Sequence, residues 1–360
     1  MSRDAWVVLT ALPPTVGHEA LIRFAAELAH QDGGSTFVVL CSQPDEPWIL
    51  ERYMAIADLA ESMSDENPLK HRRVSVLHHT DPIQQEPDGD DPAFWRMWGD
   101  ILRRFGAREG SYMVGSELYG VRFAQEVGMQ FMPYDIARDV VRAKATLLRR
   151  SLSKGTLGFG LLMPTFQKYL QFRVTVFGAE STGKTTLSRV LADDLGGRWL
   201  PEWARPYLET VGPEITDESM DAIWHGQAAL QRIAPEAPAK QGIVVQDTDL
   251  FSTVGYWDYM LPSDTPEGLI RDAHDLKSDL YIVTKSNIPF EEDPIRYGGD
   301  RRETEDHHWT DLLDKHGLNY VVLESNNLAD RRVEAGNLIR EAWRKHTNLD
   351  YVRQGKEYAT

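Results

Sequence analysis

The chain of 360 residues is long enough for two or more domains that each bury a hydrophobic core. Its 39 basic and 55 acidic residues leave a net charge of −16, which excludes broad electrostatic binding to nucleic acids or to anionic membranes. Cys41 is the only cysteine, so no intrachain disulfide is possible, and the sequence has neither a signal core nor an apolar stretch of about twenty residues. We therefore expect a cytoplasmic protein without nucleic-acid or membrane partners.

In the first half of the chain, short apolar strands alternate with amphipathic helices. Strands are expected at residues 6–9, 36–40, 74–77 and 112–114, and helices at residues 19–30, 47–62, 92–105 and from Glu117 onward. This alternation predicts a parallel, doubly wound sheet whose ligands bind outside the carboxyl ends of the strands.

The candidate binding residues of this half lie at that edge of the sheet. The loop after the first strand contains Pro13, Thr15, Gly17 and His18, and Ser116 and Glu117 follow the fourth strand. Gly17 and His18 open a helix, where free amides favour a phosphate and His18 can donate to it. A histidine in this position is more often only a surface or capping residue. Trp95 is most simply a core residue, although it could stack on a base, and Arg149 is most simply a solvated residue on a helix face.

Three glycines and Pro164 mark a domain boundary between residues 155 and 164. We expect a first domain at residues 1–154, a linker at residues 155–171, a second domain at residues 172–347 and a polar, frayed tail at residues 348–360.

A phosphate-binding motif organises the second half. Residues 178–185 satisfy G-x-x-x-x-G-K-[ST], between a predicted strand at residues 172–176 and a predicted helix at residues 185–195. The two glycines let backbone N–H groups approach one phosphate chain, Lys184 would reach the β- and γ-phosphates, and Thr185 would hold Mg²⁺. The residues expected to bind ATP are Gly178, Glu180, Ser181, Thr182, Gly183, Lys184, Thr185 and Thr186.

Two acidic clusters follow strands expected at residues 198–200 and 243–245. Because the strands of a parallel sheet end at one edge, Glu202, Asp247 and Asp249 should emerge beside the phosphate loop. Asp247 suits the carboxylate that orients the Mg²⁺ shell, and either Glu202 or Asp249 could accept the proton of a substrate hydroxyl. An acid after a strand is more often a turn residue or a helix cap, so the hypothesis rests on the convergence of both clusters on one loop.

Two further strands, at residues 280–283 and 320–323, would complete a five-stranded sheet. Between them, residues 288–302 combine flexible glycines with three arginines, Arg296, Arg301 and Arg302. Such a segment could be a lid that closes on the transferring phosphate, with Arg302 also at the ATP site. The alternative is that these arginines only pair with the five acids around them.

Over nearly the whole chain these motifs resemble the bifunctional NadR-type proteins of NAD salvage, which join a nicotinamide mononucleotide (NMN) adenylyltransferase to a ribosylnicotinamide kinase. Residues 178–185 look like that family's Gly-x-Glu-Ser-x-Gly-Lys-Ser/Thr loop. Glu202-Trp203-Ala204-Arg205 resembles its Glu-Tyr-x-Arg element and Asp247-Thr248-Asp249 its Asp-Thr-Asp/Asn segment. Asp293-Pro294-Ile295-Arg296 with Gly298 resembles its lid, where Pro294 replaces the usual Gly.

In the first half, Pro13-x-Thr15-x-Gly17-His18 is similar to the Pro-x-His/Thr-x-Gly-His signature of nucleotidyltransferases, whose His and Thr/His side chains bind the ATP phosphates. Asp135-x-x-Arg138, followed by Ala145-Thr146-x-x-Arg149, resembles their Asp-x-x-Arg and Ser-Ala-Thr-x-Ile-Arg pair. The sequence departs from these patterns at Leu9 and Ala11, where Gly and Phe are usual, and at Lys144, which stands in place of Ser. These departures leave the activity of the first half open.

The resemblance implies a Rossmann-like nucleotidyltransferase domain and a P-loop kinase domain. The kinase would use MgATP to phosphorylate nicotinamide riboside to NMN, and the first domain would adenylylate NMN with ATP to give NAD and pyrophosphate. The implied catalytic residues are Lys184, Glu202, Asp247, Asp249, Arg296, Arg301, His18 and Arg149. The implied riboside-binding residues are Glu202, Trp203, Arg205, Asp249 and Trp257. The implied nucleotidyltransferase site contains Pro13, Thr15, Gly17, His18, Trp95, Ser116, Glu117, Arg138, Thr146 and Arg149.

Two alternatives stay open at this point. The chain could be a kinase for nicotinamide riboside or another nucleoside, with a degenerate or regulatory first domain. It could instead be a nucleotide sensor that does not catalyse a reaction. The sequence also leaves open whether the protein is a homo-oligomer.

Overall fold

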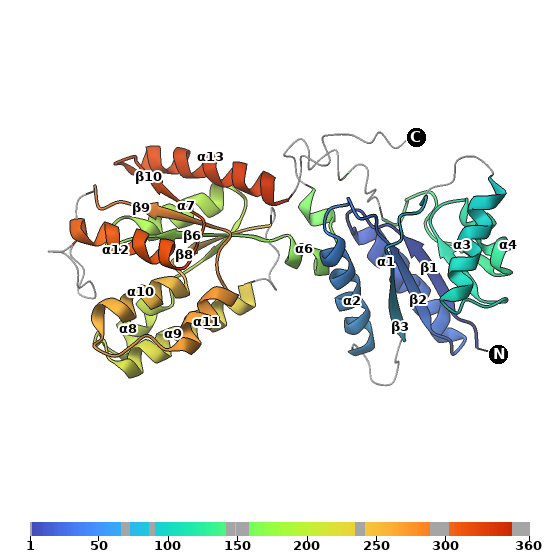
Figure 1. The fold of residues 1–360 in the computed structure, drawn as a ribbon, viewed down its shortest axis with the longest axis horizontal. Helices are drawn as coiled ribbons and strands as arrows, with labels where there is room; N and C mark the ends of the chain where they lie inside the picture. Colours follow the sequence, from blue (N-terminus) through green and yellow to red (C-terminus); the bar gives the residue numbers. More distant parts are fainter. Residues whose placement is uncertain are drawn as a thin grey trace. The chain divides into compact units, whose positions relative to one another are not determined.

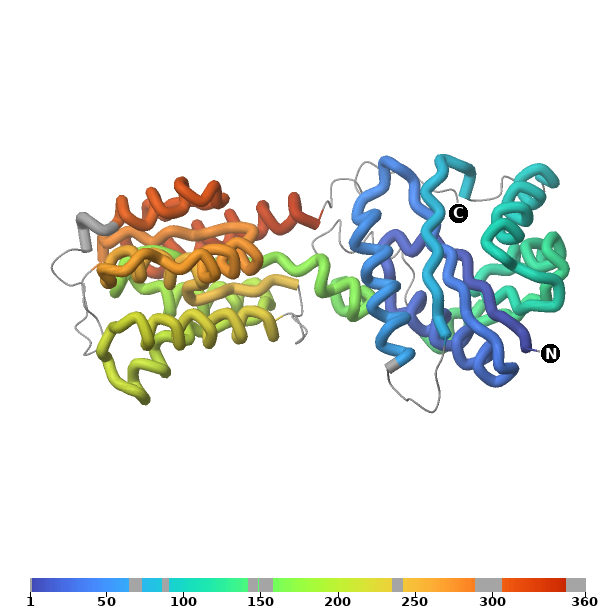
Figure 2. Tube along the Cα trace, turned by 60° about the horizontal axis from the view of Figure 1, so that its bottom comes forward, coloured from blue at the N-terminus to red at the C-terminus, as the bar shows by residue number. Residues whose placement is uncertain are grey.

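The computed structural model describes residues 2–65, 73–85, 91–141, 148, 158–234, 242–288 and 302–347 (Figure 1). The chain forms two compact units that divide between Tyr169 and Leu170. In Figure 2 the first unit runs from blue to green and the second from green to red. Each unit is built on a five-stranded parallel sheet, so the predicted α/β class with two doubly wound sheets is confirmed. None of the helices in the described ranges is long and apolar enough to cross a membrane.

The first unit places its candidate site beside the central strand. Its elements are β1 (Ala5–Leu9), α1 (Val16–Gln31), β2 (Thr36–Cys41), α2 (Ile49–Asp65), β3 (Val74–His79), α3 (Pro92–Arg104), β4 (Tyr112–Gly115), α4 (Gly120–Val127), β5 (Gln130–Pro133), η1 (Phe159–Leu161) and α6 (Pro164–Tyr169). The strand order is β3-β2-β1-β4-β5, so the chain crosses to the other half of the sheet between β3 and β4. The loops after β1 and β4 are therefore neighbours at the position where ligands bind to such sheets.

Aromatic side chains hold one face of this sheet against α3 and α4. Trp6 of β1 belongs to one buried cluster with Phe94, Trp95 and Trp98 of α3 and Phe123 of α4. Trp95 is only 4% exposed, and its ring meets Phe94 and Phe123 edge to face. Trp95 thus packs in the core, which is the simpler of the two interpretations of the sequence, and its stacking on a base stays a prediction.

The start of α1, the start of α4 and the presence of β5 differ from the expectation. α1 begins at Val16 rather than Glu19, so that Thr15 becomes its N-cap. α4 begins at Gly120, and residues 116–119 form a turn before it. β5 was not predicted, because its four residues are half-buried or exposed and carry no run of buried apolar side chains.

The segment before the second unit is packed rather than extended. The Thr165 hydroxyl donates to the Ala55 carbonyl at 2.7 Å, and the Tyr169 hydroxyl donates to Asp58 at 2.8 Å, so α6 is fixed to α2. Leu162 forms an isolated bridge with Thr15. Residues 158–169, for which the sequence predicts a linker, therefore pack within the first unit.

The second unit carries the phosphate loop on its central strand. Its elements are β6 (Phe172–Phe177), α7 (Lys184–Asp194), β7 (Arg198–Leu200), α8 (Ala204–Val211), α9 (Asp217–Ile233), β8 (Ile243–Asp247), α10 (Leu250–Met260), α11 (Glu267–Asp275), β9 (Leu280–Thr284), α12 (Arg302–Lys315), β10 (Tyr320–Leu323) and α13 (Leu328–His346). The strand order is β10-β9-β6-β8-β7, and all pairs are parallel. The loops after β6, β7 and β8 consequently open at the same edge of the sheet.

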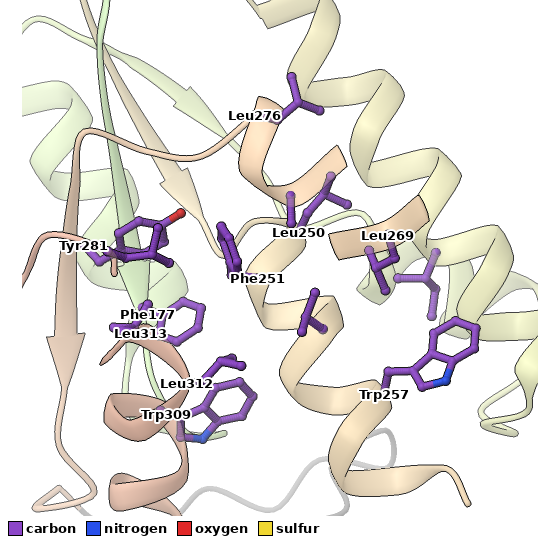
Figure 3. Packing of buried hydrophobic residues seen from close by; sticks show 14 of the residues in the cluster. Phe177, Leu250, Phe251, Trp257, Leu269, Leu276, Tyr281, Trp309, Leu312 and Leu313 are labelled. Atoms are coloured by element: carbon purple, nitrogen blue, oxygen red, sulfur yellow. The ribbon is translucent and has the colours of Figure 1, made fainter. Parts of the chain in front are cut away.

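A buried aromatic cluster anchors the strand that leads into the phosphate loop. α7 and α13 lie together on one face of the sheet, and α9, α10 and α11 lie on the other (Figure 1). Phe177, the last residue of β6, meets Tyr281 of β9 and Trp309 of α12 edge to face, with ring centroids 5.6 and 5.3 Å apart (Figure 3). Phe251 of α10 joins the same cluster. Such packing fixes the start of the loop, since Gly178 is the next residue.

Candidate functional site

The backbone of the phosphate loop needs both of its glycines. Gly178 has a φ of 129°, and a Cβ at this position would lie 2.6 Å from the carbonyl oxygen of Thr284. Gly183 has a φ of 81° and is the N-cap of α7. A residue with a side chain would be strained at either position. The loop leads directly into the N-terminus of an eleven-residue helix, the arrangement that binds a phosphate.

Side-chain hydrogen bonds close the loop on itself. The Thr182 hydroxyl, which is buried, donates to the Ala179 carbonyl at 2.8 Å and contacts the Thr284 hydroxyl at 2.7 Å. The Lys184 ammonium donates to the same Ala179 carbonyl at 2.7 Å. Lys184 therefore lies over the loop, where it can exchange this carbonyl for a phosphate oxygen.

A cavity of about 320 Å³ adjoins the loop and has a polar and an apolar part. The polar wall consists of residues 180–186 together with Glu202, Arg205 and Asp249. The apolar wall comes from α8, α9, α10 and the turn between α8 and α9, and it contains Leu208, Ile215, Met220, Ile223, Tyr256 and Met260. A ligand with a charged phosphate end and a flat apolar end fits such a lining.

Two carboxyl groups beside the loop have raised pKa values. Burial, and next the negative charge of Asp247, raise the pKa of Glu202 to about 7. Burial also raises the pKa of Asp247, while the Thr185 hydroxyl and the Lys184 ammonium lower it. A general base works best when its pKa lies near the operating pH. Glu202 can therefore accept a proton near neutrality.

Asp249 lines the cavity, but its carboxylate is engaged by the protein. As the N-cap of α10 it accepts the backbone N–H of Phe251 at 3.0 Å. It also accepts the Tyr281 hydroxyl at 2.7 Å and the Thr175 hydroxyl at 3.4 Å. Burial raises the pKa of Asp249 to about 6. Asp249 thus acts as a helix cap, the alternative role that its position after a strand suggested.

Asp247 and Thr185 have the chemistry that a magnesium ion requires. The Oδ1 atom of Asp247 is buried and has no hydrogen-bond partner in the part of the chain that the structure describes. The same side chain bonds to the hydroxyl of Thr185, the second residue of α7. A buried carboxylate oxygen without a donor is unfavourable unless a cation occupies the site, and Mg²⁺ prefers oxygen ligands. The two residues therefore fit the ion.

Arg331 connects three segments around the cavity and was not identified from the sequence. It lies on α13, is 1% exposed and lines the cavity. Its guanidinium donates to the carbonyls of Thr182 in the phosphate loop at 2.7 Å, Lys285 after β9 at 2.8 Å and Ser325 after β10 at 2.9 Å. A fork of fixed donors is suited to joining several carbonyls. No local signal distinguishes Arg331 from an exposed arginine on a helix, since two of its partners, Thr182 and Lys285, lie far away in the sequence.

The structure separates the predicted riboside-binding residues into two groups. Glu202, Arg205 and Asp249 line the cavity. Trp257 is buried in the core and donates its Nε1 to Ser263 at 3.3 Å. Trp203 is 38% exposed and its indole packs on Gly226 of α9.

Neither Trp203 nor Trp257 is among the residues that line the cavity, and their stacking on a nicotinamide ring stays a prediction. Tyr256, one residue before Trp257, lines it instead, because α10 turns the tryptophan toward the core. The predicted lid arginines Arg296 and Arg301 lie outside the described residues, as does the side chain of Arg302 at the start of α12.

In the first unit, the predicted signature lies in the loop and first helical turn after β1. Thr15 caps α1, and its backbone N–H donates to His18 Nδ1 at 3.0 Å. Since Nδ1 accepts this bond, a neutral His18 ring carries its proton on Nε2, a hydrogen-bond donor at a helix N-terminus. Pro13 and Gly17 belong to the same loop and turn. Ala11 has a φ of 45°, a left-handed conformation that favours glycine.

The loops after β4 and β5 contribute a second group to the same edge of the sheet. Arg138 donates to Glu117 at 2.7 Å, and Ser116 lies half-buried next to Glu117. The Asp135 carboxylate accepts the backbone N–H groups of Val140 and Val141 at 3.0 and 2.8 Å, which lower its pKa. Asp135 therefore shapes the turn that carries Arg138. Thr146 and Arg149, with Lys144, lie outside the described residues.

Comparison with known proteins identifies the fold of the whole chain. A crystal structure of NadR protein in complex with NR has 22% sequence identity to this chain and a TM-score of 0.63, and the match covers 95% of this chain and 98% of that chain. The chain has the NadR fold. A structure of NadR protein in complex with NAD and AMP-PNP gives 22% identity and a TM-score of 0.62, over 95% of this chain and 96% of that chain.

Two comparisons of the sequence alone cover less of the chain than the structural comparison does. A family model described as an AAA domain matches residues 173–331, the range that contains the phosphate loop and its cavity. No curated protein sequence matches the chain. The NadR fold thus accounts for both units, while the roles of individual residues rest on the geometry described above.

Proposed function

We propose that the second unit is a kinase that transfers the γ-phosphate of ATP to the 5′-hydroxyl of nicotinamide riboside. The observation that carries this proposal is the cavity in which a phosphate loop, a carboxyl group with a pKa of about 7 and an apolar wall meet. The ligands named for the two similar NadR structures, NR in one and NAD with AMP-PNP in the other, support a nucleoside as the acceptor.

Different residues around the cavity would bind the phosphates and accept the proton. Lys184 and the N-terminus of α7 hold the triphosphate, and Glu202 accepts the proton of the sugar hydroxyl as its oxygen forms a bond to the γ-phosphorus. The bond from that phosphorus to the bridging oxygen breaks, and ADP leaves. Mg²⁺ held by Asp247 and Thr185 would neutralise charge on the phosphates. Glu202 is favoured over Asp249 as the base, because the Asp249 carboxylate is engaged by Tyr281 and the start of α10.

A mass-spectrometric assay of the full chain with nicotinamide riboside and MgATP tests the kinase. We expect repeated turnover to NMN, and its loss in a Lys184→Ala variant that retains the wild-type circular dichroism spectrum. Turnover of another nucleoside alone would identify a kinase of different specificity. ATP binding without turnover of any nucleoside would indicate a sensor.

We further propose that the first unit adenylylates NMN with ATP. The observation that favours it is His18, whose ring is oriented by Thr15 at a helix N-terminus between two neighbouring loops. The NMN phosphate would attack the α-phosphorus of ATP, pyrophosphate would leave, and His18 and Arg149 would stabilise charge on the ATP phosphates. Incubation of the full chain with NMN and MgATP should yield NAD, and a His18→Ala variant should yield none. If the wild type makes no NAD while it makes NMN, the first unit is degenerate or regulatory.

A further inference from the structure

A buried amide in the wall of the cavity has no acceptor for its donor group. Gln227 lies on α9, lines the cavity and is only 3% exposed. Its Oε1 atom accepts the backbone N–H of Trp203 at 2.9 Å. Its Nε2 atom is buried and has no hydrogen-bond partner within the described ranges of the chain.

The orientation of this amide is fixed by its neighbour. A backbone N–H can only donate, so the oxygen of the Gln227 amide must face Trp203, and the NH₂ group is the one left over. Burying a donor without a partner is unfavourable, because the group loses its hydrogen bonds to water and gains none in return. Such a group in a native cavity therefore requires an explanation.

Gln231, one turn further along α9, shows what a fully bonded amide looks like in the same helix. Its Oε1 accepts the backbone N–H of Leu250 at 3.2 Å, and its Nε2 donates to the carbonyl of Leu276 at 3.2 Å. Gln231 is as buried as Gln227, at 1% exposure, but it does not line the cavity. Both the oxygen and the NH₂ group of Gln231 are thus hydrogen-bonded within the protein. Of Gln227, which lines the cavity, only the oxygen is hydrogen-bonded within the described residues.

We propose that Gln227 is a specificity-determining residue, whose Nε2 donates a hydrogen bond to an oxygen of the bound nucleoside. This inference rests on the proposed kinase function and adds the group that recognises the acceptor. Gln227 is bonded to the residue after Glu202, the proposed base, and shares one face of α9 with Ile223 and Met220 of the apolar wall. It therefore lies where the polar and apolar walls of the cavity meet. The oxygen is a ribose hydroxyl or the carbonyl of the ring carboxamide, and the two share the same acceptor chemistry.

The test uses Gln227→Glu, which keeps the volume and the acceptor for Trp203 but replaces the NH₂ donor by a carboxylate oxygen. We expect kcat/KM for nicotinamide riboside to fall by about 10- to 100-fold, because a hydrogen bond to substrate is lost. The KM for ATP should stay the same. The matched control is Gln231→Glu, which should lower the thermal unfolding temperature without changing the preference among nucleosides. If Gln227→Glu does not fold, Gln227→Met replaces it in the same assays.

Substrate analogues identify the oxygen. Wild type and variant are compared on nicotinamide riboside, on its 2′-deoxy and 3′-deoxy forms, and on a form whose carboxamide is replaced by methyl. For the oxygen that Gln227 binds, removal should reduce kcat/KM in the wild type and cause no further loss in the variant. Equal relative rates for every analogue in both proteins would overturn the inference while leaving the kinase intact. A wild type that phosphorylates none of them would instead overturn the proposed function, and this inference with it.

Discussion

At the scale of single residues, the proposed kinase reaction depends on the protonation state of Glu202. The carboxylate accepts a proton only when it is ionised, and burial beside Asp247 raises its pKa to about 7. A raised pKa in an acid keeps the group protonated, and inactive as a base, up to higher pH. The ionised fraction therefore increases through neutrality, in contrast to an exposed glutamate, which is ionised far below it.

We expect kcat/KM for phosphorylation to rise with pH and to level off above about 7, as Glu202 loses its proton in the free enzyme. Glu202→Gln should lower kcat by about 10²- to 10⁴-fold and remove this rise. Rates measured from pH 5.5 to 9 at saturating MgATP provide the check. If Glu202→Gln keeps both the rate and the pH profile of the wild type, Glu202 is not the base, and Asp249 becomes the first candidate.

The residue scale also shows which site residues a sequence can reveal. The phosphate loop could be predicted because its glycines, Lys184 and Thr185 are neighbours in the chain, and the geometry at Gly178 explains its glycine. The sequence could not show that Tyr256 lines the cavity while its neighbour Trp257 packs in the core, since this depends on how α10 is turned about its axis. Gln227 could not be identified either, because which end of its amide is bonded depends on a contact with Trp203, 24 residues earlier in the chain.

At the scale of elements, α13 holds three loops together through one side chain. Arg331 donates to carbonyls that follow β9 and β10 and to one inside the phosphate loop. A buried guanidinium is tolerated only while its acceptors remain in place, and removing one partner of such a network is strongly unfavourable. The loops on which ATP binding depends are thus fixed by a helix that comes after all the strands.

Arg331→Met should lower the free energy of unfolding by about 3–5 kcal/mol. Arg331→Lys should raise the KM for ATP more than the KM for the nucleoside, since the lysine cannot reach all three loops. The matched control is the next residue: Arg332 is exposed and pairs with Asp194 of α7, so Arg332→Met should change stability by about 0–1 kcal/mol. Urea titrations and steady-state kinetics measure both effects. Similar losses in the two variants would show that Arg331 has no special role.

The strands and helices also show where prediction from the sequence succeeds. Strands buried on both faces, such as β8 with its five buried residues, carry a clear apolar signal. β5 lacks that signal, and its pairing with β4 becomes visible only in the sheet. Glycines before α6 favour a linker, yet α6 donates hydrogen bonds to Ala55 and Asp58 of α2, a helix about a hundred residues earlier in the chain.

At the scale of the whole molecule, the two candidate sites lie in separate compact units, each with its own sheet and core. The proposed reactions follow one another, because the NMN made by the second unit is the substrate of the first. NMN can pass through solution if the sites work independently. Two variants, each inactive at a different site, should then restore the complete conversion when they are mixed.

A Lys184→Ala chain and a His18→Ala chain should each fail to convert nicotinamide riboside into NAD. An equimolar mixture of the two should restore NAD formation, because each variant retains the site that the other lacks. The Lys184→Ala chain should also make NAD when NMN is supplied. Chromatography of the products measures all three. A mixture that stays inactive, while each variant performs its remaining step alone, would mean that NMN is not released between the sites.

The most direct test of the central claim follows the phosphate itself. ATP labelled at the γ-phosphate is incubated with Mg²⁺, nicotinamide riboside and the full chain, and the label is traced by mass spectrometry. The structure predicts that the label appears in the 5′-phosphate of NMN in the wild type and does not appear there in the Lys184→Ala chain. Label found only in inorganic phosphate, at the same rate with and without the riboside, would contradict the account.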